Sequence, residues 1–505
     1  MKDLKLNYKK TIYIGLAFML ITMFWQTYDN IIAKILIDKF GLKQSTSGIV
    51  MALDNVLAIF MLPLFGLLSD KTKSKLGKRT PFIIVGVLIA SIAYVSLSFV
   101  DHRQTVLVNE AGIVEEYKDI YEKETISIEE WDITFDKIKE THPEIYNDYQ
   151  KIRGSNDERE RYDVFYNYLS ARAWELTKND TKNLIGFIIL LLITLIAMST
   201  FRSPAVALMP DVTPKPLRSK ANAIINLMGS AGAVIALLIL QLTNTAKESY
   251  VPYSPVFISV GVIMILLLIV FLIKVKENDL LKENEQLIKQ YGLEDEEDAP
   301  GVPHKLTKPE IISLVLILFS VFFWYMGYNA VISKLSDYAP KILNMGVTLP
   351  LFIAQGAAII AFIPIGILSS KFGRKKMILV GVIMLTLCFG GAYFLTPNTG
   401  WILYILLAFT GIAWATINVN SFPMAVELAT GNDVGKFTGY YYAFSMAAQI
   451  ITPILSGILM DISRLYLFPY AAIMVAVSFF TMLFVKHGDV KVERKGILES
   501  FDVED

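Results

Sequence analysis

The stretch Phe24-Trp25-Gln26-Thr27-Tyr28-Asp29-Asn30 opens a string of residues that this chain repeats about 300 positions later. The string comprises Tyr28-Asp29, Lys34, Gly66, Ser69 and Lys71, and it returns as Tyr328-Asn329, Lys334, Gly366, Ser369 and Lys371. Both copies begin in an apolar segment with a Phe-Trp pair and end in a basic turn between further apolar segments. An ordered repeat at one offset indicates two related halves.

The composition indicates a membrane protein. Of 505 residues, 54% are hydrophobic and only 19% are charged, and the mean hydropathy is +0.49. The charges gather in short stretches, and the apolar runs between them are long enough to cross about 30 Å of hydrocarbon. We predict an all-α membrane protein with twelve transmembrane helices in two pseudo-symmetric bundles, at 10–37, 45–68, 81–100, 184–209, 218–243, 254–274, 310–336, 348–369, 376–395, 401–425, 437–461 and 466–486.

The sequence gives no sign of metal or nucleic-acid chemistry. Cys388 is the only cysteine, so a disulfide framework and a thiolate metal site are excluded. The four histidines are scattered outside the predicted spans and lack ligand spacing. With a net charge of zero, no nucleic-acid partner is expected. We therefore predict no cofactor, apart from a coupling ion discussed below, and the lipid bilayer as a partner.

The basic residues predict the orientation. They are concentrated before the first span and in the loops after spans 2, 4 and 8, whereas the alternate loops hold only one or two each. Because short cytoplasmic loops are enriched in Lys and Arg, we expect both termini in the cytoplasm. The first apolar run is too long for a signal sequence and is read as a retained helix. The Cys-poor, Lys-rich composition favours a bacterial plasma membrane.

The chain divides into six regions. The segment 101–182 carries 20 acidic and 12 basic residues, and its apolar residues recur at helical spacing, so we expect an extracellular helical insert between helices 3 and 4. The predicted division is 1–100 (N-half, helices 1–3), 101–182 (insert), 183–274 (N-half, helices 4–6), 275–309 (cytoplasmic linker), 310–486 (C-half, helices 7–12) and 487–505 (cytoplasmic tail).

Two motifs carry a family resemblance. The first is Gly66-Leu-Leu-Ser69-Asp70-Lys71 followed by Gly77-Lys78-Arg79-Thr80-Pro81-Phe82, which resembles the helix 2–3 signature of the major facilitator superfamily. The residues before Gly77 and the Arg-x-Pro-Phe ending resemble the sucrose-transporter and glycoside–pentoside–hexuronide symporter branches. Gly66 permits close helix packing, and Asp70 can act as a latch. The second copy, around Gly366, lacks the acid.

The second motif runs from Arg202-Ser-Pro to Met209-Pro210-Asp211 and continues at Arg218. It resembles the helix 4–5 stretch of sucrose-type transporters. Together the motifs imply a cytoplasmic gate formed by Gly66, Asp70, Gly77, Lys78, Arg79, Asp211, Arg218, Gly366, Arg374 and Glu427. Melibiose-type permeases carry paired helix-2 aspartates where this chain has Leu62 and Ala58, so that sodium site is not carried over.

Three ionisable residues lie within predicted spans, namely Asp29, Asp54 and Arg202. Such groups are costly in hydrocarbon and usually functional. Asp54 and Arg202 are predicted at similar depths, and the arginine side chain could reach across to the carboxylate. We expect the three to couple ion movement to transport. The alternatives are an Asp–Arg pair that only satisfies packing and an Asp29 that lies in water beyond the end of its helix.

The repeat places the acids in one half. Asp29 corresponds to Asn329, and Asp54-Asn55 corresponds to Ala354-Gln355. We therefore expect the N-half to bind the coupling ion and the C-half to bind most of a neutral polar substrate. Aromatic faces and amides are the groups that bind sugars. The candidate substrate residues are Trp25, Gln26, Tyr28, Asn55, Asn226, Trp324, Tyr328, Asn329, Gln355, Asn418 and Gln449.

The resemblance and the intramembrane acids together favour a symporter of a neutral sugar, a disaccharide or glucoside, driven by protons and working as a monomer by alternating access. Sodium coupling and export of another small solute remain alternatives within the class. A membrane receptor that uses the 101–182 insert is the alternative of another class. An enzyme is not expected, because no nucleophile–base pair or metal cluster is present.

Overall fold

A computed structural model describes residues 5–123, 126–214, 217–245, 247–291, 306–428 and 434–488. Within these ranges the chain is helical and contains no strand. Six long helices form the N-half: α1 (Tyr8–Asp38), α2 (Gln44–Lys71), α3 (Thr80–Glu110), α8 (Lys182–Asp211), α9 (Arg218–Leu242) and α10 (Ser254–Lys274). Six more form the C-half: α12 (Lys308–Ile342), α13 (Thr348–Phe372), α14 (Arg374–Ala392), α15 (Ile402–Val426), α16 (Val434–Ile462) and α17 (Leu467–Leu483).

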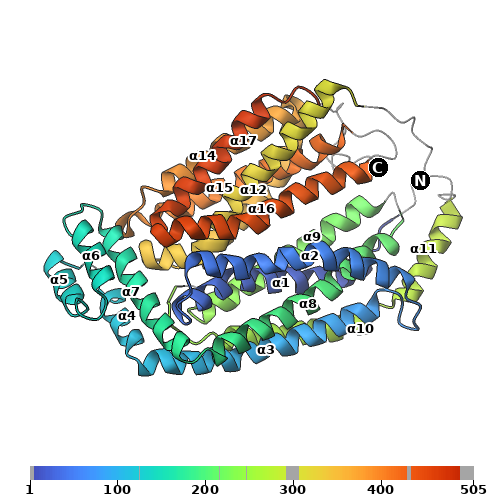
Figure 1. Ribbon diagram of the computed structural model, residues 1–505. Coiled ribbons are helices and arrows are strands. Elements are labelled where there is room, and N and C mark those ends of the chain that lie inside the picture. Colours follow the sequence, from blue (N-terminus) through green and yellow to red (C-terminus); the bar gives the residue numbers. More distant parts are fainter. Residues whose placement is uncertain are drawn as a thin grey trace.

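The remaining helices lie at the two ends of the molecule. The insert between α3 and α8 comprises α4 (Ile113–Tyr121), α5 (Ile128–Asp136), α6 (Pro143–Ile152) and α7 (Glu158–Asn179). The linker between the halves contains α11 (Glu277–Tyr291). Two 3-10 turns, η3 (Pro397–Thr399) and η5 (Arg464–Tyr466), connect C-half helices. Figure 1 shows the insert at one end of the bundle and α11 at the other, and we call these the insert end and the linker end.

The prediction of an all-α protein with two six-helix bundles and a helical insert is confirmed. Eleven helices in the described part of the chain are long and apolar enough to cross a membrane, and α13 contributes the shorter apolar stretch Thr348–Phe362. Two helices run further than the apolar pattern predicted. The third predicted span ends at residue 100, but α3 continues to Glu110, and the seventh ends at 336, but α12 continues to Ile342. Charged side chains in both extensions have buried partners. The helices can therefore continue beyond the end of their apolar stretches.

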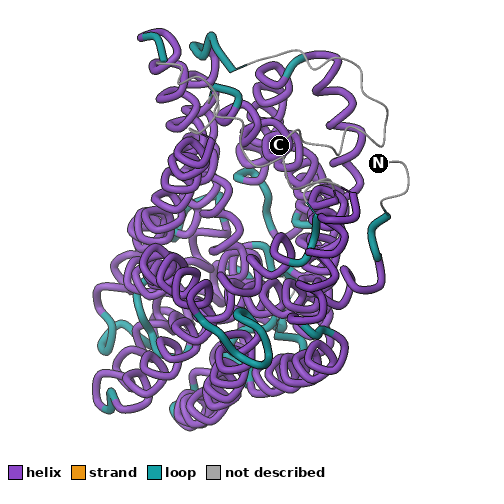
Figure 2. The backbone as a smooth tube through the Cα atoms, turned by 90° about the vertical axis from the view of Figure 1, so that its right-hand side faces the viewer, coloured by secondary structure: helices purple, strands orange, loops and turns teal. Residues whose placement is uncertain are grey.

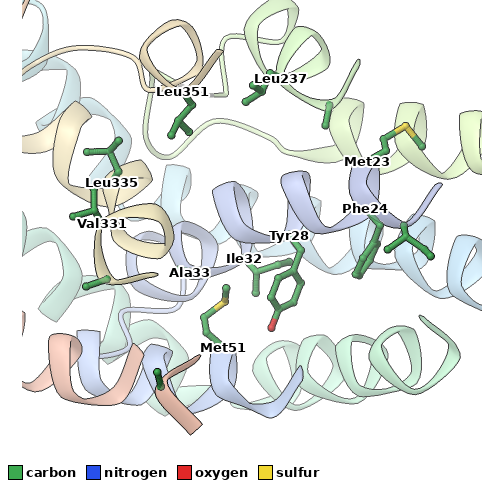
Figure 3. Close-up of a cluster of buried hydrophobic side chains, with 14 of the residues drawn as sticks. Met23, Phe24, Tyr28, Ile32, Ala33, Met51, Leu237, Val331, Leu335 and Leu351 are labelled. Atoms are coloured by element: carbon green, nitrogen blue, oxygen red, sulfur yellow. The ribbon is translucent and has the colours of Figure 1, made fainter. Parts of the chain in front are cut away.

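The two halves share one hydrophobic core across their seam. Figure 2 shows the backbone from the linker end, with helices packed side by side. Figure 3 shows Tyr28 and Ile32 of α1 beside residues of other elements, including Met51 of α2 and Leu335 of α12. The insert has a separate core, rich in aromatic side chains, around Trp131. The insert therefore packs as a small helical body at the insert end of the bundle.

Candidate functional site

A cavity of about 280 Å³ lies at the seam, with walls from both halves. Eleven residues of α1, α2, α8, α12 and α16 line it: Trp25, Asp29, Met51, Asp54, Asn55, Arg202, Asn329, Ile332, Ser333, Gln449 and Pro453. Asp54 lies ten residues into α2, or roughly 15 Å along the helix axis at 1.5 Å per residue. The cavity is thus near mid-depth, where carriers built from two repeats hold their substrate.

The N-half wall of the cavity is charged. Asp29 and Asp54 both face it, as does Arg202. The Asn55 side chain donates a hydrogen bond to Asp54 Oδ1 at 2.7 Å. The guanidinium of Arg202 lies over the Trp25 ring, 5.6 Å from its centroid. An arginine on an indole face is held by a cation–π contact.

The predicted pairing of Asp54 with Arg202 is not a direct ion pair in this conformation. Among the described residues, no nitrogen of Arg202 lies within 4.0 Å of an Asp54 carboxylate oxygen. Both side chains instead line the same cavity. The charges therefore remain accessible to a ligand or ion between them.

Two hydrogen-bond donors of the cavity have no protein partner. The indole Nε1 of Trp25 and the amide Nδ2 of Asn329 are buried, and neither donates to another described residue. Buried donors are nearly always satisfied by protein, water or ligand. Asn329 and Ser333 are one helical turn apart on α12, as Trp25 and Asp29 are on α1, so each pair presents one face to the cavity.

Seven of the eleven candidate substrate residues lie outside the cavity lining: Gln26, Tyr28, Asn226, Trp324, Tyr328, Gln355 and Asn418. Tyr28 and Trp324 are buried in the apolar core. Tyr328 stacks on Trp414 with ring centroids 3.6 Å apart, and Asn418 donates to the backbone oxygen of Trp414 within its own helix. Asn226 is exposed.

Four lining residues were missed by the sequence reasoning: Met51, Ile332, Ser333 and Pro453. Met51, Ile332 and Pro453 have no hydrogen-bonding side-chain group, so a search for polar recognition groups does not find them. Ser333 could have been found, because it follows Asn329 by four residues and so shares its helical face.

The linker end of the N-half carries a compact polar cluster. Arg79 pairs with Asp70 and, through Nε, with Asp211 Oδ2 at 2.9 Å, while Lys78 Nζ reaches the same Asp211 oxygen at 3.1 Å. Arg218 donates to the backbone oxygens of Thr213 and Pro210. Gly66 faces α8, where an added Cβ would lie 3.1 Å from Ser203 Oγ.

Glu277, the first residue of α11, completes this cluster and was not a candidate. It is 1% exposed. Its carboxylate accepts hydrogen bonds from the backbone N–H groups of Lys78, Arg79 and Thr80 at 2.8–3.1 Å, and from the Thr80 hydroxyl. A carboxylate is favoured at a helix N-terminus, here that of α3. Gly77 has a φ of +111°, and a Cβ there would overlap Glu277.

The related turn of the C-half also carries an ion pair. Arg374 at the start of α14 donates to Glu427 at 2.9 Å. An added Cβ at Gly366 would meet nothing within 4 Å, unlike one at Gly66. The two halves therefore differ in the packing of their related turns.

Hydrogen bonds across the seam gather at the insert end. Lys341 of α12 pairs with Asp38 of α1 at 2.5 Å and with Asp337 on its own helix. Gln44 of α2 donates to Asp337 at 2.5 Å, and its backbone N–H donates to Asp461 of α16 at 2.6 Å. These groups lie near the ends of α1, α2, α12 and α16 at the insert end.

Two buried lysines occupy related positions in the repeat but have different partners. Lys34 donates to the backbone oxygens of Thr245 and Glu248, within the N-half. Lys334 donates to the backbone oxygen and to Oε1 of Gln44, across the seam, both at 3.1 Å.

The burial of α2 shows where the halves separate. Its buried residues are Gln44, Ser47, Gly48, Met51, Ala52 and Ala58, in the half of the helix nearer the insert, and Ser69 near its end. The residues between Ala58 and Ser69 are partly or fully exposed. The halves are thus closed together at the insert end and diverge toward the linker end.

Two bundles of six long apolar helices, with a polar cavity at their seam, define a membrane transporter. The chain belongs to the Major Facilitator Superfamily, whose family profile matches residues 173–361 and 318–500. A second profile, described as MFS/sugar transport protein, matches residues 12–106.

The comparisons include uncharacterized relatives and solved transporters. An uncharacterized MFS-type transporter of Methanocaldococcus jannaschii is 24% identical over 330 residues, which cover 64% of this chain and 77% of the relative. A bacterial homologue of the iron transporter ferroportin, in an inward-facing state, superposes with a TM-score of 0.58, 12% identity and coverage of 95% and 99% of the two chains. The inward-open xylose transporter XylE of E. coli superposes with a TM-score of 0.55 and 15% identity, and the match covers 96% of each chain. At these identities the solved structures establish the fold.

Proposed function

We propose that this protein is a proton-coupled symporter of a neutral sugar, of the sucrose or maltose type, that works by alternating access. The observation that carries the proposal is the seam cavity. It combines two carboxylates, Asp29 and Asp54, with an aromatic face at Trp25 and the unpartnered donor of Asn329. Aromatic faces and hydrogen-bonding groups are what a sugar ring requires.

The chemistry of the two cavity walls suggests separate roles in ion coupling and substrate binding. Asp29, Asp54 and Arg202 come from the N-half, whereas Asn329, Ser333 and Gln449 come from the C-half and are uncharged. Burial away from water favours the neutral form of a carboxyl group, so such a group can take up a proton and release it when its surroundings change. We assign ion coupling to the N-half wall and hydroxyl recognition to both walls. The profile described as a sugar transport protein supports a sugar as the substrate.

The cluster at the linker end is proposed as the cytoplasmic gate. Arg79, Asp70 and Asp211 hold α2, α3 and α8 together within the N-half, and Arg374 with Glu427 does the same in the C-half. With the termini and linker in the cytoplasm of a bacterial cell, as the basic loops favour, this conformation opens inward. The insert then faces outward, and the chain acts as a monomer.

Uptake by purified protein in liposomes tests the proposal. A panel of mono- and disaccharides is presented with an inward pH gradient or an inward sodium gradient. We expect accumulation of one sugar class with the pH gradient alone. If accumulation requires the sodium gradient, sodium rather than the proton is the coupling ion. If no sugar accumulates under either gradient, the proposed function is refuted.

Asp54→Asn separates coupling from binding. Because the amide cannot exchange a proton in this pH range, we expect pH-driven accumulation to disappear while exchange of internal for external sugar continues. Asp132→Asn, a carboxylate of the insert far from the cavity in the fold, is the matched control and should leave both assays unchanged. Uphill uptake retained by Asp54→Asn would refute its role.

A further inference from the structure

The insert is fixed to the N-half from which it emerges. α3 runs without a break from the bundle to Glu110. Arg172 of α7 donates to the backbone oxygen of Ala111 at 2.6 Å, and the Tyr117 hydroxyl of α4 accepts from the backbone N–H of Ser249, beyond α9, at 3.1 Å. These contacts tie the insert to the N-half at its base.

The α7 helix also reaches across the seam to the C-half. Arg159, at the start of α7, donates to the backbone oxygen of Tyr393 and to that of Leu395 at 2.7 Å, both just beyond α14. Its side chain is 7% exposed. Multiple donors directed at main-chain oxygens are a strength of the guanidinium. The insert therefore spans both halves at the closed end of the molecule.

A second bridge is made by a buried ion pair. Asp163 accepts from Arg464 of η5 at 2.7 Å, with side-chain exposures of 5% and 1%, and it also accepts from the backbone N–H of Arg464. Asn167, one turn along α7, accepts from the same guanidinium at 2.6 Å. One face of α7 thus binds η5, the turn that connects α16 and α17.

This bridge continues into the seam contacts of the bundle. Arg464 Nε donates to Asp337 at 3.0 Å, and Asp337 is also held by Gln44 and Lys341. Lys341 in turn pairs with Asp38. A continuous buried network therefore connects the insert, the C-half and the N-half.

We infer that the insert is a clasp that keeps the insert end of the transporter closed, with Asp163, Asn167 and Arg159 as its contact residues. The inference rests on the alternating-access mechanism proposed above. When the halves separate at this end, an insert attached to the N-half must leave Arg464 and the carbonyls after α14. Removing one partner of a buried pair leaves an uncompensated charge, so opening is costly while the clasp is intact. Weakening the clasp should shift the protein toward the state open at the insert end.

Distances between spin labels in lipid nanodiscs test this without any substrate. In a Cys388→Ser background, which removes the single cysteine, labels are placed at exposed positions of the two halves. Lys182→Cys with Trp401→Cys reports the insert end, and Lys73→Cys with Lys376→Cys reports the linker end. For Asp163→Asn we expect more long distances at the insert end and more short distances at the linker end. The ratio of insert-open to insert-closed molecules should rise about tenfold, the size expected for loss of one charged hydrogen bond.

The controls separate the clasp from general damage to the insert. Asp132→Asn removes a carboxylate that pairs with Arg153 inside the insert and should leave both distance distributions as in the wild type. Asn167→Ala and Arg159→Gln remove other bridge contacts and should shift them in the same direction as Asp163→Asn, which keeps the test valid if the aspartate variant folds poorly. Unchanged distances in all three bridge variants, or an equal shift in Asp132→Asn, would overturn the inference. Because no sugar is present, a shift in the bridge variants supports the clasp even if the uptake assay refutes sugar transport.

Discussion

At the scale of single residues, Glu277 shows how a side chain from the linker organises the turn after α2. Its carboxylate receives three backbone N–H groups at the start of α3 and is almost fully buried. An amide in its place offers one acceptor oxygen and points N–H groups at other donors. The first residue of α11 therefore holds the linker helix onto the N-half.

We expect Glu277→Gln to destabilise the protein by about 2 kcal/mol, in the range for losing charged hydrogen bonds and leaving buried donors unsatisfied. Thermal unfolding in detergent would show this as a lower midpoint. The control is Asp279→Asn, an exposed acid in the same first turn of α11, for which no comparable shift is expected. Equal midpoints for the two variants would contradict the assigned role.

A pH dependence is expected within the insert at Asp132. Hydrogen bonds from Arg153, aided by the Tyr149 hydroxyl, lower the pKa of this carboxyl group. A lowered folded pKa contributes stability that is present above the unfolded value of about 3.9 and is lost as the pH falls through the folded pKa. The contribution is small, because Arg153 is half exposed.

Hydrogen exchange of residues 128–152 in the intact protein measures this effect. After correction for intrinsic exchange rates, we expect protection to decrease below about pH 4, and Asp132→Asn to remove that part of the decrease. If the protection of Asp132→Asn changes with pH in the same way as that of the wild type, the pH dependence does not come from Asp132.

Sequence reasoning at this scale found the charges that lie in apolar runs. Asp29, Asp54 and Arg202 were identifiable because each interrupts a hydrophobic segment, and they line one cavity. Glu277 and Asp163 were not identifiable. Each lies in a charged stretch where acids are common, and each partner is about 200 or 300 residues away in the chain. Burial of one acid among many is decided by tertiary packing.

At the scale of helices, close contact between α2 and α16 closes the insert end. A Cβ at Gly48 would overlap the backbone oxygen of Pro453, and one at Gly457 would overlap that of Gln44. Glycines allow two helix backbones to approach this closely within a membrane. The apolar pattern predicted both helices but could not show that each glycine lies against the backbone of the other helix.

We expect Gly48→Val to hold α2 and α16 apart and to favour the state open at the insert end. In the Cys388→Ser background, Met51→Cys lies just beyond this contact, and Met51 is 4% exposed. Its reaction with an impermeant thiol reagent added at the insert side should become at least several times faster in Gly48→Val. Gly186→Val on α8 is the control, since a Cβ there meets nothing within 4 Å. A rate unaffected by Gly48→Val would show that the contact does not control closure.

At the scale of the whole molecule, the two ends differ in charge and in structure. The insert, with its excess of acidic residues, lies at one end, and the basic turns around Lys78 and Arg374 lie with α11 at the other (Figure 1). From the positive-inside rule we expect the insert to face the outside of the cell. The twofold repeat and the charge pattern allowed the architecture to be predicted from the sequence, whereas the state of the seam depends on contacts between the halves.

Labelling of single cysteines in intact cells tests this orientation. We expect Glu129→Cys, exposed on α5, to react with an impermeant maleimide, and Glu285→Cys, exposed on α11, to react only after permeabilisation. The reverse pattern would invert the topology and would make the present conformation outward-facing.

The different partners of the two repeat-related lysines have a consequence for turnover. Lys34 donates to carbonyl groups of its own bundle. We therefore expect it to keep these partners when the two halves move relative to each other. Lys334 donates to Gln44 of the opposite bundle, so we expect separation of the halves at this end, as in the proposed alternating access, to remove these partners and admit water to the ammonium group. Since an ammonium ion is costly to remove from water, we expect hydration and dehydration of Lys334 to recur in each proposed transport cycle, whereas Lys34 keeps the same partners throughout.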